Sequence, residues 1–299
     1  MNGQSRETAI AFRGELLRNE PMERHTSLKT GGPADFFAIP EDSDDLCGLL
    51  SWLQGEGLPW MTIGRGYNLL VRDGGIRGCV ISLERFNRIG LVDELFVEAE
   101  AGAENLPVVR FAQQRGLGGI SFISGIPGTI GGALTMNAGA YGQGILSHTE
   151  QLTLLRNGTV MSVCRDEIKY AYRRLELEAG DIVLAARFRL SECDAGIVEE
   201  DIRRDLELRR TKHNVGFPSA GSFFKNPPGQ AAWRLIDAAG LRGTAVGGAL
   251  VSEVHSNFLV NAGGATTRDF LALAETIKNQ VCAISGVTLE EEVRIVGEI

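Results

Sequence analysis

Two glycine-rich stretches contain the residues of this sequence that are best suited to hold an anion. Residues 125–142 read GIPGTIGGALTMNAGAYG, with six glycines and no charged side chain. Residues 64–70 read GRGYNLL and directly follow the apolar run 58–63. Glycine lets backbone approach a ligand closely, and the N–H groups of such turns form concavities that suit a phosphate or diphosphate. We predict that both stretches clamp a phosphate-bearing ligand, although each could also be an ordinary tight turn.

Apolar periodicity predicts the elements that position these stretches. For the first part of the chain, we expect a helix from residue 43 to Gly55, strands over 58–63, 79–83 and 91–101, and a helix over 104–115. Asn157 and Gly158 between two apolar runs predict a β-hairpin, and another strand is expected over 182–190.

The composition changes near residues 191–196, where we predict a domain boundary. Beyond it, the pattern indicates helices over 198–210 and 230–239, a strand over 255–261, and a final strand over 287–296. A long helix precedes the final strand: Thr266 and Asp269 have the spacing of a capping box, and Gly286 marks the end of the helix.

The composition also restricts the class of protein. The chain has 299 residues and a net charge of −8, without a basic block or an apolar run of the ~18 residues that a membrane span requires. We expect about two domains, no nucleic-acid partner and no membrane insertion, and nothing suggests an obligate protein partner. The N-terminus lacks the pattern of a signal peptide, which predicts a cytoplasmic protein. The five cysteines show no CxxC spacing and the four histidines no HxxxH pair, so we predict no disulfide and no metal.

The two glycine-rich stretches do not match the dinucleotide-binding fingerprint GxGxxG. Gly64 and Gly66 are followed by Leu69 where the third glycine is required, and the stretch from Gly125 departs from the pattern as well. The Rossmann fingerprint therefore fails.

Six ordered motifs resemble those of the bacterial UDP-N-acetylenolpyruvoylglucosamine reductase family: GRGYNLL, SGIPGTIGGALTMNAGAYG, YAYR, AGSFFKNP, HSNFLVN and LEEEVRIVG. Residues 25–37, HTSLKTGGPADFF, also resemble the opening motif of that family, so the similarity covers about residues 17–297. It implies an α+β protein with an FAD-binding fold of the vanillyl-alcohol oxidase type. The FAD-binding domain would span residues 1–195 and consist of two subdomains, about 1–83 and 84–195. Residues 196–299 would form an α+β substrate-binding domain. The short C-terminal part leaves no room for the tyrosine-bearing loop of the family's longer type.

The resemblance implies a reaction as well. The family reduces the enolpyruvyl ether of UDP-N-acetylglucosamine to UDP-N-acetylmuramate for peptidoglycan synthesis, with non-covalent FAD as cofactor and NADPH as co-substrate. Hydride reaches the vinyl carbon, and the enol-like anion that results needs donors at its oxygens and a proton at the neighbouring carbon. No nicotinamide motif is visible, which suggests that NADPH and the sugar nucleotide share one pocket.

Three residues match the family's catalytic positions. Ser222 in AGSFFKNP matches the proton donor, and Arg173 in YAYR matches the arginine that binds the carboxylate, a task suited to its planar, permanently charged fork. Glu292 in LEEEV matches a third residue, which would help to stabilise the enol. Apart from the resemblance, Ser222 could cap local backbone, Arg173 could be a surface arginine, and Glu292 could belong to a solvated acidic face.

Further residues are candidates for binding. For FAD, we expect contacts from Gly64, Arg65, Gly66, Tyr67, Asn68, Leu69, Gly125, Ile126, Pro127, Gly128, Thr129, Gly131, Gly132 and Ala133, with Thr129 as a hydroxyl donor. For the UDP-sugar, the candidates are Asn137, Tyr141, Lys225, Asn226, His255 and Asn257. His255 could equally be an ordinary core histidine. The chain departs from the family at Tyr67, where serine is more common, and at residues 212–214, where a Gln-Pro pair is common.

Two other functions are open at this point. One is an oxidase of the same flavin fold, in which His148 would be the nearest candidate for covalent attachment of the flavin. The other is a flavin-binding module without catalysis. The GSFFKNP and LEEEV motifs favour the reductase over the oxidase, and the intact catalytic positions argue against the silent module.

Overall fold

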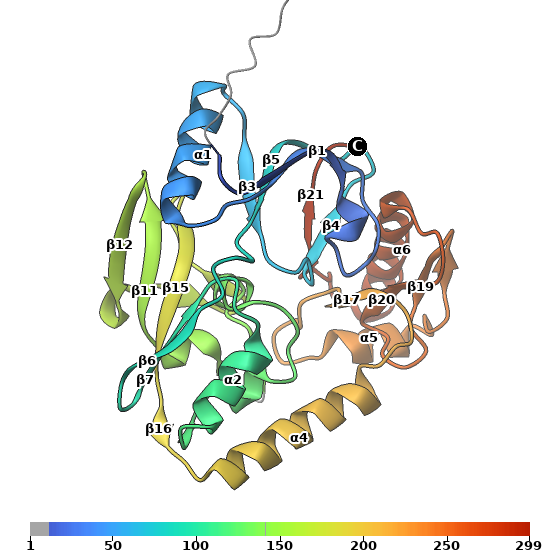
Figure 1. The fold of residues 1–299 in the computed structure, drawn as a ribbon. Coiled ribbons are helices and arrows are strands. Elements are labelled where there is room, and N and C mark those ends of the chain that lie inside the picture. Colours follow the sequence, from blue (N-terminus) through green and yellow to red (C-terminus); the bar gives the residue numbers. More distant parts are fainter. Residues whose placement is uncertain (1–11, 141) are drawn as a thin grey trace, which may run out of the picture.

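A four-stranded sheet supports the first glycine-rich turn, in residues 64–70. The computed structural model describes residues 12–140 and 142–299 (Figure 1). The sheet has the order β1-β2-β5-β3 and consists of β1 (Glu15–Pro21), β2 (Pro33–Ile39), β5 (Ile76–Ser82) and β3 (Trp60–Ile63). Both β2 and β3 run parallel to β5. The predicted helix is confirmed as α1 (Ser43–Gly55), and the side chain of Asp42 caps it by accepting a hydrogen bond from the backbone N–H of Asp45.

A second, antiparallel sheet has the order β12-β11-β15-β7-β6. Its strands are β6 (Ile89–Asp93), β7 (Phe96–Glu100), β11 (Thr149–Arg156), β12 (Thr159–Cys164) and β15 (Ile182–Arg189). The predicted hairpin is confirmed, because Asn157 and Gly158 turn the chain with φ angles of 49° and 76°. The single strand expected over 91–101 is wrong. β6 and β7 form a hairpin there, and the Asp93 side chain accepts a hydrogen bond from the Glu94 N–H at the turn.

Three helices accompany the second sheet: α2 (Asn105–Gln113), α3 (Ile130–Thr135) and α4 (Ala195–Lys212). Val108, Ile130 and Ile202 each bury a side chain in a core shared with this sheet. The short helix α3 lies inside the second glycine-rich stretch and was not predicted. In Figure 1, α4 runs along the lower edge of the molecule from the second sheet toward the C-terminal elements.

A third sheet, with the order β17-β20-β19-β18, packs with two helices. The strands are β17 (Ser219–Ser222), β18 (Ala245–Val246), β19 (Ala249–Val251) and β20 (Phe258–Asn261), and the helices are α5 (Ala232–Ala238) and α6 (Thr267–Ser285). The predicted capping box of Thr266 and Asp269 is confirmed, and Gly286 ends α6 with a φ of 71°.

The last strand of the chain returns to the first part of the molecule. β21 (Arg294–Val296) pairs in parallel with β4 (Leu69–Val71), which directly follows the first glycine-rich turn. The strand expected over 287–296 is therefore wrong except for 294–296. The backbone of residues 290–293 instead bonds to the loop after β17, where Phe223 accepts the N–H of Glu292 at 2.8 Å. This pairing brings the first glycine-rich turn and Glu292 side by side.

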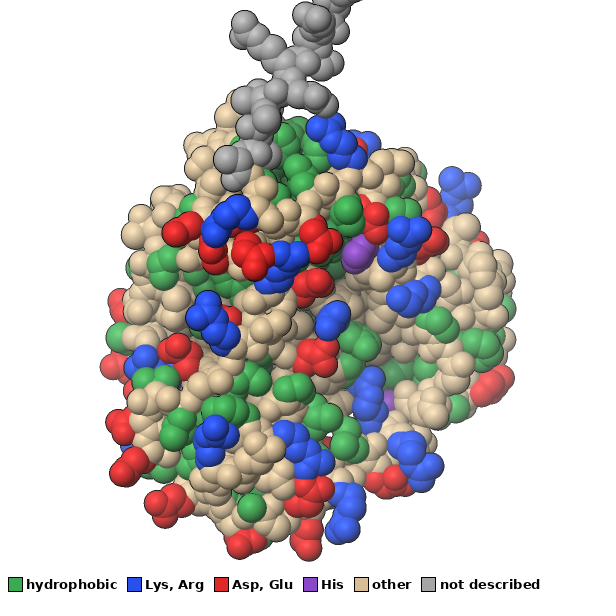
Figure 2. Space-filling model, viewed as in Figure 1, with side chains coloured by type: hydrophobic (Ala, Val, Ile, Leu, Met, Phe, Trp, Pro, Cys, Tyr) green, Lys and Arg blue, Asp and Glu red, His purple; other side chains and the backbone are tan. Residues whose placement is uncertain are grey.

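Short elements complete the described ranges. The two-residue strands are β8 (Leu117–Gly118), β9 (Gly139–Ala140), β10 (Gln143–Gly144), β13 (Tyr170–Ala171), β14 (Arg174–Leu175) and β16 (Ser191–Glu192). The 3₁₀ helices are η1 (Met22–Arg24), η2 (Ser121–Ile123), η3 (Ile145–His148) and η4 (Arg165–Glu167). Acidic and basic side chains are interspersed over the face seen in Figure 2. None of the helices in residues 12–140 and 142–299 is both long and apolar enough to span a bilayer.

Candidate functional site

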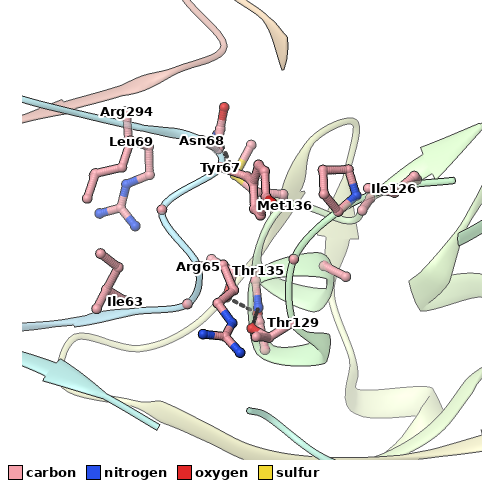
Figure 3. Close-up of a pocket in the computed structure, with 18 of the residues that line it drawn as sticks. Ile63, Arg65, Tyr67, Asn68, Leu69, Ile126, Thr129, Thr135, Met136 and Arg294 are labelled. Carbon is pink, nitrogen blue, oxygen red and sulfur yellow. Dashed lines mark hydrogen bonds between the residues drawn. The ribbon is translucent and has the colours of Figure 1, made fainter. Parts of the chain in front are cut away.

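The two glycine-rich turns face one another across a cavity of about 490 Å³ (Figure 3). The first turn, in residues 64–70, connects β3 to β4, and the second, in residues 125–142, leads into α3. The predicted cofactor residues that line this cavity are Gly64, Arg65, Gly66, Tyr67, Asn68, Leu69, Ile126, Pro127, Gly128, Thr129, Gly131, Gly132 and Ala133. Gly125 lies instead on an adjoining cavity that shares Gly64, Arg65 and Tyr67 with the first.

Close backbone approach explains two of the glycines. A Cβ on Gly64 would lie 2.8 Å from Oγ1 of Thr129, so the two turns meet where any side chain would separate them. Gly66 has a φ of 65°, and a Cβ there would lie 2.1 Å from the carbonyl oxygen of His25. Glycine is therefore required by conformation at Gly66 and by space at Gly64.

Backbone donors in both turns are available to an anion. Among the hydrogen bonds of the described residues, none is donated by the N–H groups of Arg65, Gly66, Tyr67, Gly128 or Thr129. Gly66 and Thr129 are buried residues, and a buried N–H requires a partner. A ligand with several acceptor oxygens would supply these partners, so the residues present fit the diphosphate of FAD.

Asn105 and Arg209 also belong to this region, although sequence reasoning missed both. Asn105 is 2% exposed and donates to the carbonyl of Ile126 at 2.9 Å, while its own Oδ1 has no partner within the described part of the chain. Nη1 of Arg209 donates to the carbonyl of Gly125 at 2.8 Å, and burial lowers the pKa of its guanidinium. Both residues line both cavities. Arg209 was one of several arginines on a charged helix, and only the fold directs it inward.

The three residues expected to be catalytic line the same cavity as the two turns. Ser222 ends β17, and its hydroxyl makes no hydrogen bond to another residue in the described ranges. Arg173 lies between β13 and β14 and has a φ of 58°, a strained conformation for an arginine that tends to occur at functional sites. Glu292 lies just before β21, which begins at Arg294.

Arg173 and Glu292 form a half-buried ion pair. Nε of Arg173 lies 2.9 Å from Oε1 of Glu292, and the two side chains are 24% and 14% exposed. The Nε–H is not directed at the oxygen, so the pair is a charge contact rather than an aligned hydrogen bond. Burial raises the pKa of Glu292 above its usual value, against the opposing effect of the Arg173 and Lys225 charges. A substrate carboxylate could therefore compete with Glu292 for the guanidinium.

The backbone of Glu292 is held from two sides. Its N–H donates to the carbonyl of Phe223 at 2.8 Å, and its carbonyl accepts from Nδ2 of Asn68 at 3.1 Å. Phe223 directly follows Ser222, and Asn68 belongs to the first glycine-rich turn. The backbone that carries this carboxylate is thus bonded both to the segment of the candidate proton donor and to the candidate cofactor turn.

The five described candidates for binding the sugar nucleotide lie outside the cavity lining. Lys225 pairs with Glu290 at 3.2 Å, and Oδ1 of Asn226 accepts from the N–H of Ala232 at the start of α5. Asn137, with a φ of 41°, donates to the carbonyl of Ala171 at 3.1 Å and so supports the segment that carries Arg173. The side chains of these three candidates line neither cavity.

Two further candidates are held in protein contacts. Asn257 is 2% exposed, and its amide bonds to the backbone of Phe224. His255 packs against Phe258 with ring centroids 4.5 Å apart, and burial lowers its pKa to about 4. Neither Asn257 nor His255 lines the cavity. Tyr141 lies outside the described residues.

The two departures from the family pattern both reach the cavity. Tyr67 lines it with an exposed side chain. His213 lines both cavities, and its ring lies 5.5 Å from that of His255. His148, the candidate for covalent attachment of flavin, lines neither cavity and contacts Gln143 at 3.3 Å instead.

Comparison with known proteins first defines the class. Residues 34–163 match the family model of an FAD-binding domain, which makes this chain a flavin-binding protein. Residues 212–296 match the model of the UDP-N-acetylenolpyruvoylglucosamine reductase C-terminal domain.

Relatives then define the family. A UDP-N-acetylenolpyruvoylglucosamine reductase of Pelobacter propionicus is 67% identical over 97% of this chain and 99% of its own length. That of Geotalea uraniireducens is 56% identical over 96% of both chains. The crystal structure of the Thermus caldophilus reductase superposes with a TM-score of 0.81 at 31% identity, covering 95% of this chain and 98% of the other. The chain belongs to the UDP-N-acetylenolpyruvoylglucosamine reductase family.

Family membership confirms several predictions made from the sequence. The resemblance itself is confirmed, as are the α+β fold with an FAD-binding domain and the expectation of FAD and NADPH chemistry. The length of 299 residues agrees with the shorter type of the family.

Proposed function

We propose that this chain reduces UDP-N-acetylglucosamine enolpyruvate to UDP-N-acetylmuramate with NADPH, in peptidoglycan synthesis. The observation that carries the proposal is that Ser222, Arg173 and Glu292, from three distant segments, line one cavity together with both glycine-rich turns. Bound FAD would carry the hydride from NADPH to the enolpyruvyl group. The residues of the chain bind and orient the substrate and supply the proton.

Arg173 would bind the carboxylate of the enolpyruvyl group. A guanidinium stays charged through the reaction and can pair both carboxylate oxygens, so it also stabilises the negative charge that develops on them. Its left-handed backbone and its contact with Glu292 limit the directions in which it can point before substrate enters. This preorganisation lowers the cost of aligning the substrate.

Ser222 would deliver the proton to the carbon that becomes the stereocentre. A serine hydroxyl is a weak acid, so the transfer depends on the strong basicity of the carbon that receives the proton. The hydroxyl has no competing partner in residues 12–140 and 142–299, which leaves its proton directed by the substrate. Glu292 would stabilise the enol: burial raises its pKa, which makes the protonated form, able to donate a hydrogen bond to an enol oxygen, more accessible than in an exposed glutamate.

We also propose that residues 1–195, with parts of about 1–83 and 84–195, bind FAD and that 196–299 bind the sugar nucleotide. The first two sheets belong to the first range and the third sheet to the second. The strand β21 joins the second range to the first through β4, and α4 packs Ile202 into the core of the second sheet.

An anaerobic two-step experiment tests the proposal. The purified chain, without a partner protein, is bleached with NADPH, and the recovery of the oxidised flavin spectrum is followed after the enolpyruvyl sugar nucleotide is added. We expect rapid recovery that requires this substrate. Recovery with air but not with the sugar nucleotide would point to an oxidase, and a flavin that NADPH cannot bleach would point to a module without catalysis.

A variant at Ser222 tests the assigned roles. Ser222→Ala should leave reduction by NADPH unchanged and slow the recovery step by about 10²-fold or more, because the proton donor acts only in that step. Ser256→Ala is the matched control, since this hydroxyl lies in the same part of the chain, donates to the Trp233 carbonyl at 2.8 Å and lines no cavity. Equal recovery rates in the two variants would refute the role of Ser222.

A further inference from the structure

Asn257 clamps the two residues that follow Ser222. Its Oδ1 accepts the N–H of Phe224 at 3.0 Å, and its Nδ2 donates to the carbonyl of the same residue at 2.8 Å. Its backbone carbonyl accepts the N–H of Phe223 at 2.7 Å. The amide therefore takes the place of a neighbouring strand, satisfying one N–H and one C=O of a single residue.

The position of this clamp follows from the sheet. β17 and β20 pair as far as Ser222 opposite Phe258, with an irregularity in the register between Ser219 and Ser222. Beyond Ser222, no strand pairing continues along β20. The next contacts on this side come from Asn257, whose backbone carbonyl accepts the N–H of Phe223 and whose side chain bonds the backbone of Phe224. On the side of β20, one buried asparagine therefore holds the chain as it leaves Ser222.

The clamped segment also holds the backbone of Glu292. The carbonyl of Phe223 accepts the N–H of Glu292 at 2.8 Å, and Phe224 forms a bridge with Glu291. Phe223 and Phe224 are fully buried, so the segment cannot shift without disturbing the core. Residues 223–224 therefore lie between Asn257 on one side and the backbone of Glu292 on the other.

We propose that Asn257 is a positioning residue that fixes the hydroxyl of Ser222 relative to the carboxylate of Glu292. It acts through the backbone of Phe223 and Phe224, without contacting the substrate. The proposal rests on the proposed function, because it assigns a consequence to the proton transfer from Ser222. An amide is required at this position, since alanine loses both side-chain bonds and aspartate keeps only the acceptor.

A double-mutant cycle in the holoenzyme tests this role. Both half-reactions are measured per bound flavin, so that loss of folded protein cancels. Asn257→Ala should slow flavin recovery with the enolpyruvyl sugar nucleotide by about tenfold or more and leave reduction by NADPH within about twofold. In a Ser222→Ala background, Asn257→Ala should slow recovery by no more than about twofold, because the hydroxyl that it positions is absent. Asn257→Asp, which retains one bond, should give an intermediate rate and serves if the alanine variant does not fold.

Asn261→Ala is the matched control. Asn261 is the last residue of β20, the strand that begins directly after Asn257. It is 9% exposed and also bonds only to backbone, donating to Leu28 and accepting from Gly263 and Ala265 at 3.0 to 3.1 Å. It should lower stability without changing either half-reaction. Equal slowing by Asn257→Ala in the presence and absence of the Ser222 hydroxyl would overturn the positioning role. If Ser222→Ala itself recovers normally, the proposed function fails instead.

Discussion

Substituting alanine for Gly64 tests how closely the two glycine-rich turns must approach. The backbone at Gly64 is not left-handed, so alanine is tolerated by conformation and the effect is steric. The new Cβ would lie 2.8 Å from Oγ1 of Thr129, whereas such contacts are ordinary from 3.4 Å, so this oxygen must move by about 0.6 Å. A movement of this size corresponds to a rotation of the Thr129 side chain by about 25°, which costs about 1 kcal/mol.

The expected consequence is weaker binding of FAD. The displaced Thr129 oxygen no longer has its place in the anion site, and the methyl group occupies space between the turns. Together with the cost of rotation, we expect a loss of about 1.4–2.8 kcal/mol, or ten- to a hundredfold in the dissociation constant. The assay is titration of the apoprotein with FAD, followed by quenching of flavin fluorescence.

A second substitution makes the test specific. Thr129→Ala removes the atom that clashes, so the double variant Gly64→Ala, Thr129→Ala should bind FAD more tightly than Gly64→Ala alone. Gly48→Ala is the control: a Cβ on this exposed position of α1 meets nothing within 4 Å, and it should raise stability by about 0.5–1 kcal/mol without affecting FAD. Wild-type FAD affinity in Gly64→Ala, or no relief in the double variant, would refute the reasoning.

Three further predictions concern stability, measured by urea unfolding. Since burial raises the pKa of Glu292, the free energy of unfolding of the wild type should fall as pH rises through that pKa. Glu292→Gln should lack this fall, and parallel pH profiles of the two proteins would contradict the prediction. The hydrogen bond from Arg156 lowers the pKa of Asp181. The stability that this pair contributes should therefore be present above the ordinary pKa of an aspartate and be lost as pH falls through the lowered pKa. Asp181→Asn should flatten the acid limb of the stability profile, and an unchanged limb would exclude the effect. Thr266→Ala removes the cap of α6 and should cost about 1 kcal/mol, whereas an unchanged midpoint would show that the cap contributes nothing.

Local signals in the sequence predicted the parts of the fold whose conformation depends on near neighbours. Asn157 and Gly158 specify a turn by their tolerance of positive φ, and the capping box of Thr266 with Asp269 specifies where a helix begins. The glycine-rich turns were recognisable for the same reason. Each of these features is decided within a few residues.

The errors arose where distant segments decide the outcome. The apolar pattern of residues 287–296 is that of a strand, yet only 294–296 find a strand partner, in β4, because Phe223 takes the N–H of Glu292. The amides of Asn257 and Asn226, both candidates for the sugar nucleotide, bond to backbone in the fold. An amide that binds backbone and one that binds a ligand have the same letter in the sequence, so residue type alone does not predict these bonds.

The pairing of β4 with β21 has a consequence for the synthesis of the chain. At about 5–20 residues per second, a ribosome adds the more than two hundred residues between these strands in roughly 10–45 s. During that time the first glycine-rich turn exists without the strand that fixes its far end. Nascent chains should therefore be unable to retain FAD, and the cofactor should load only after residues 294–296 have left the ribosome. Cellular flavin shortage would then be felt by unloaded chains that already contain residues 294–296, rather than by chains that still lack them.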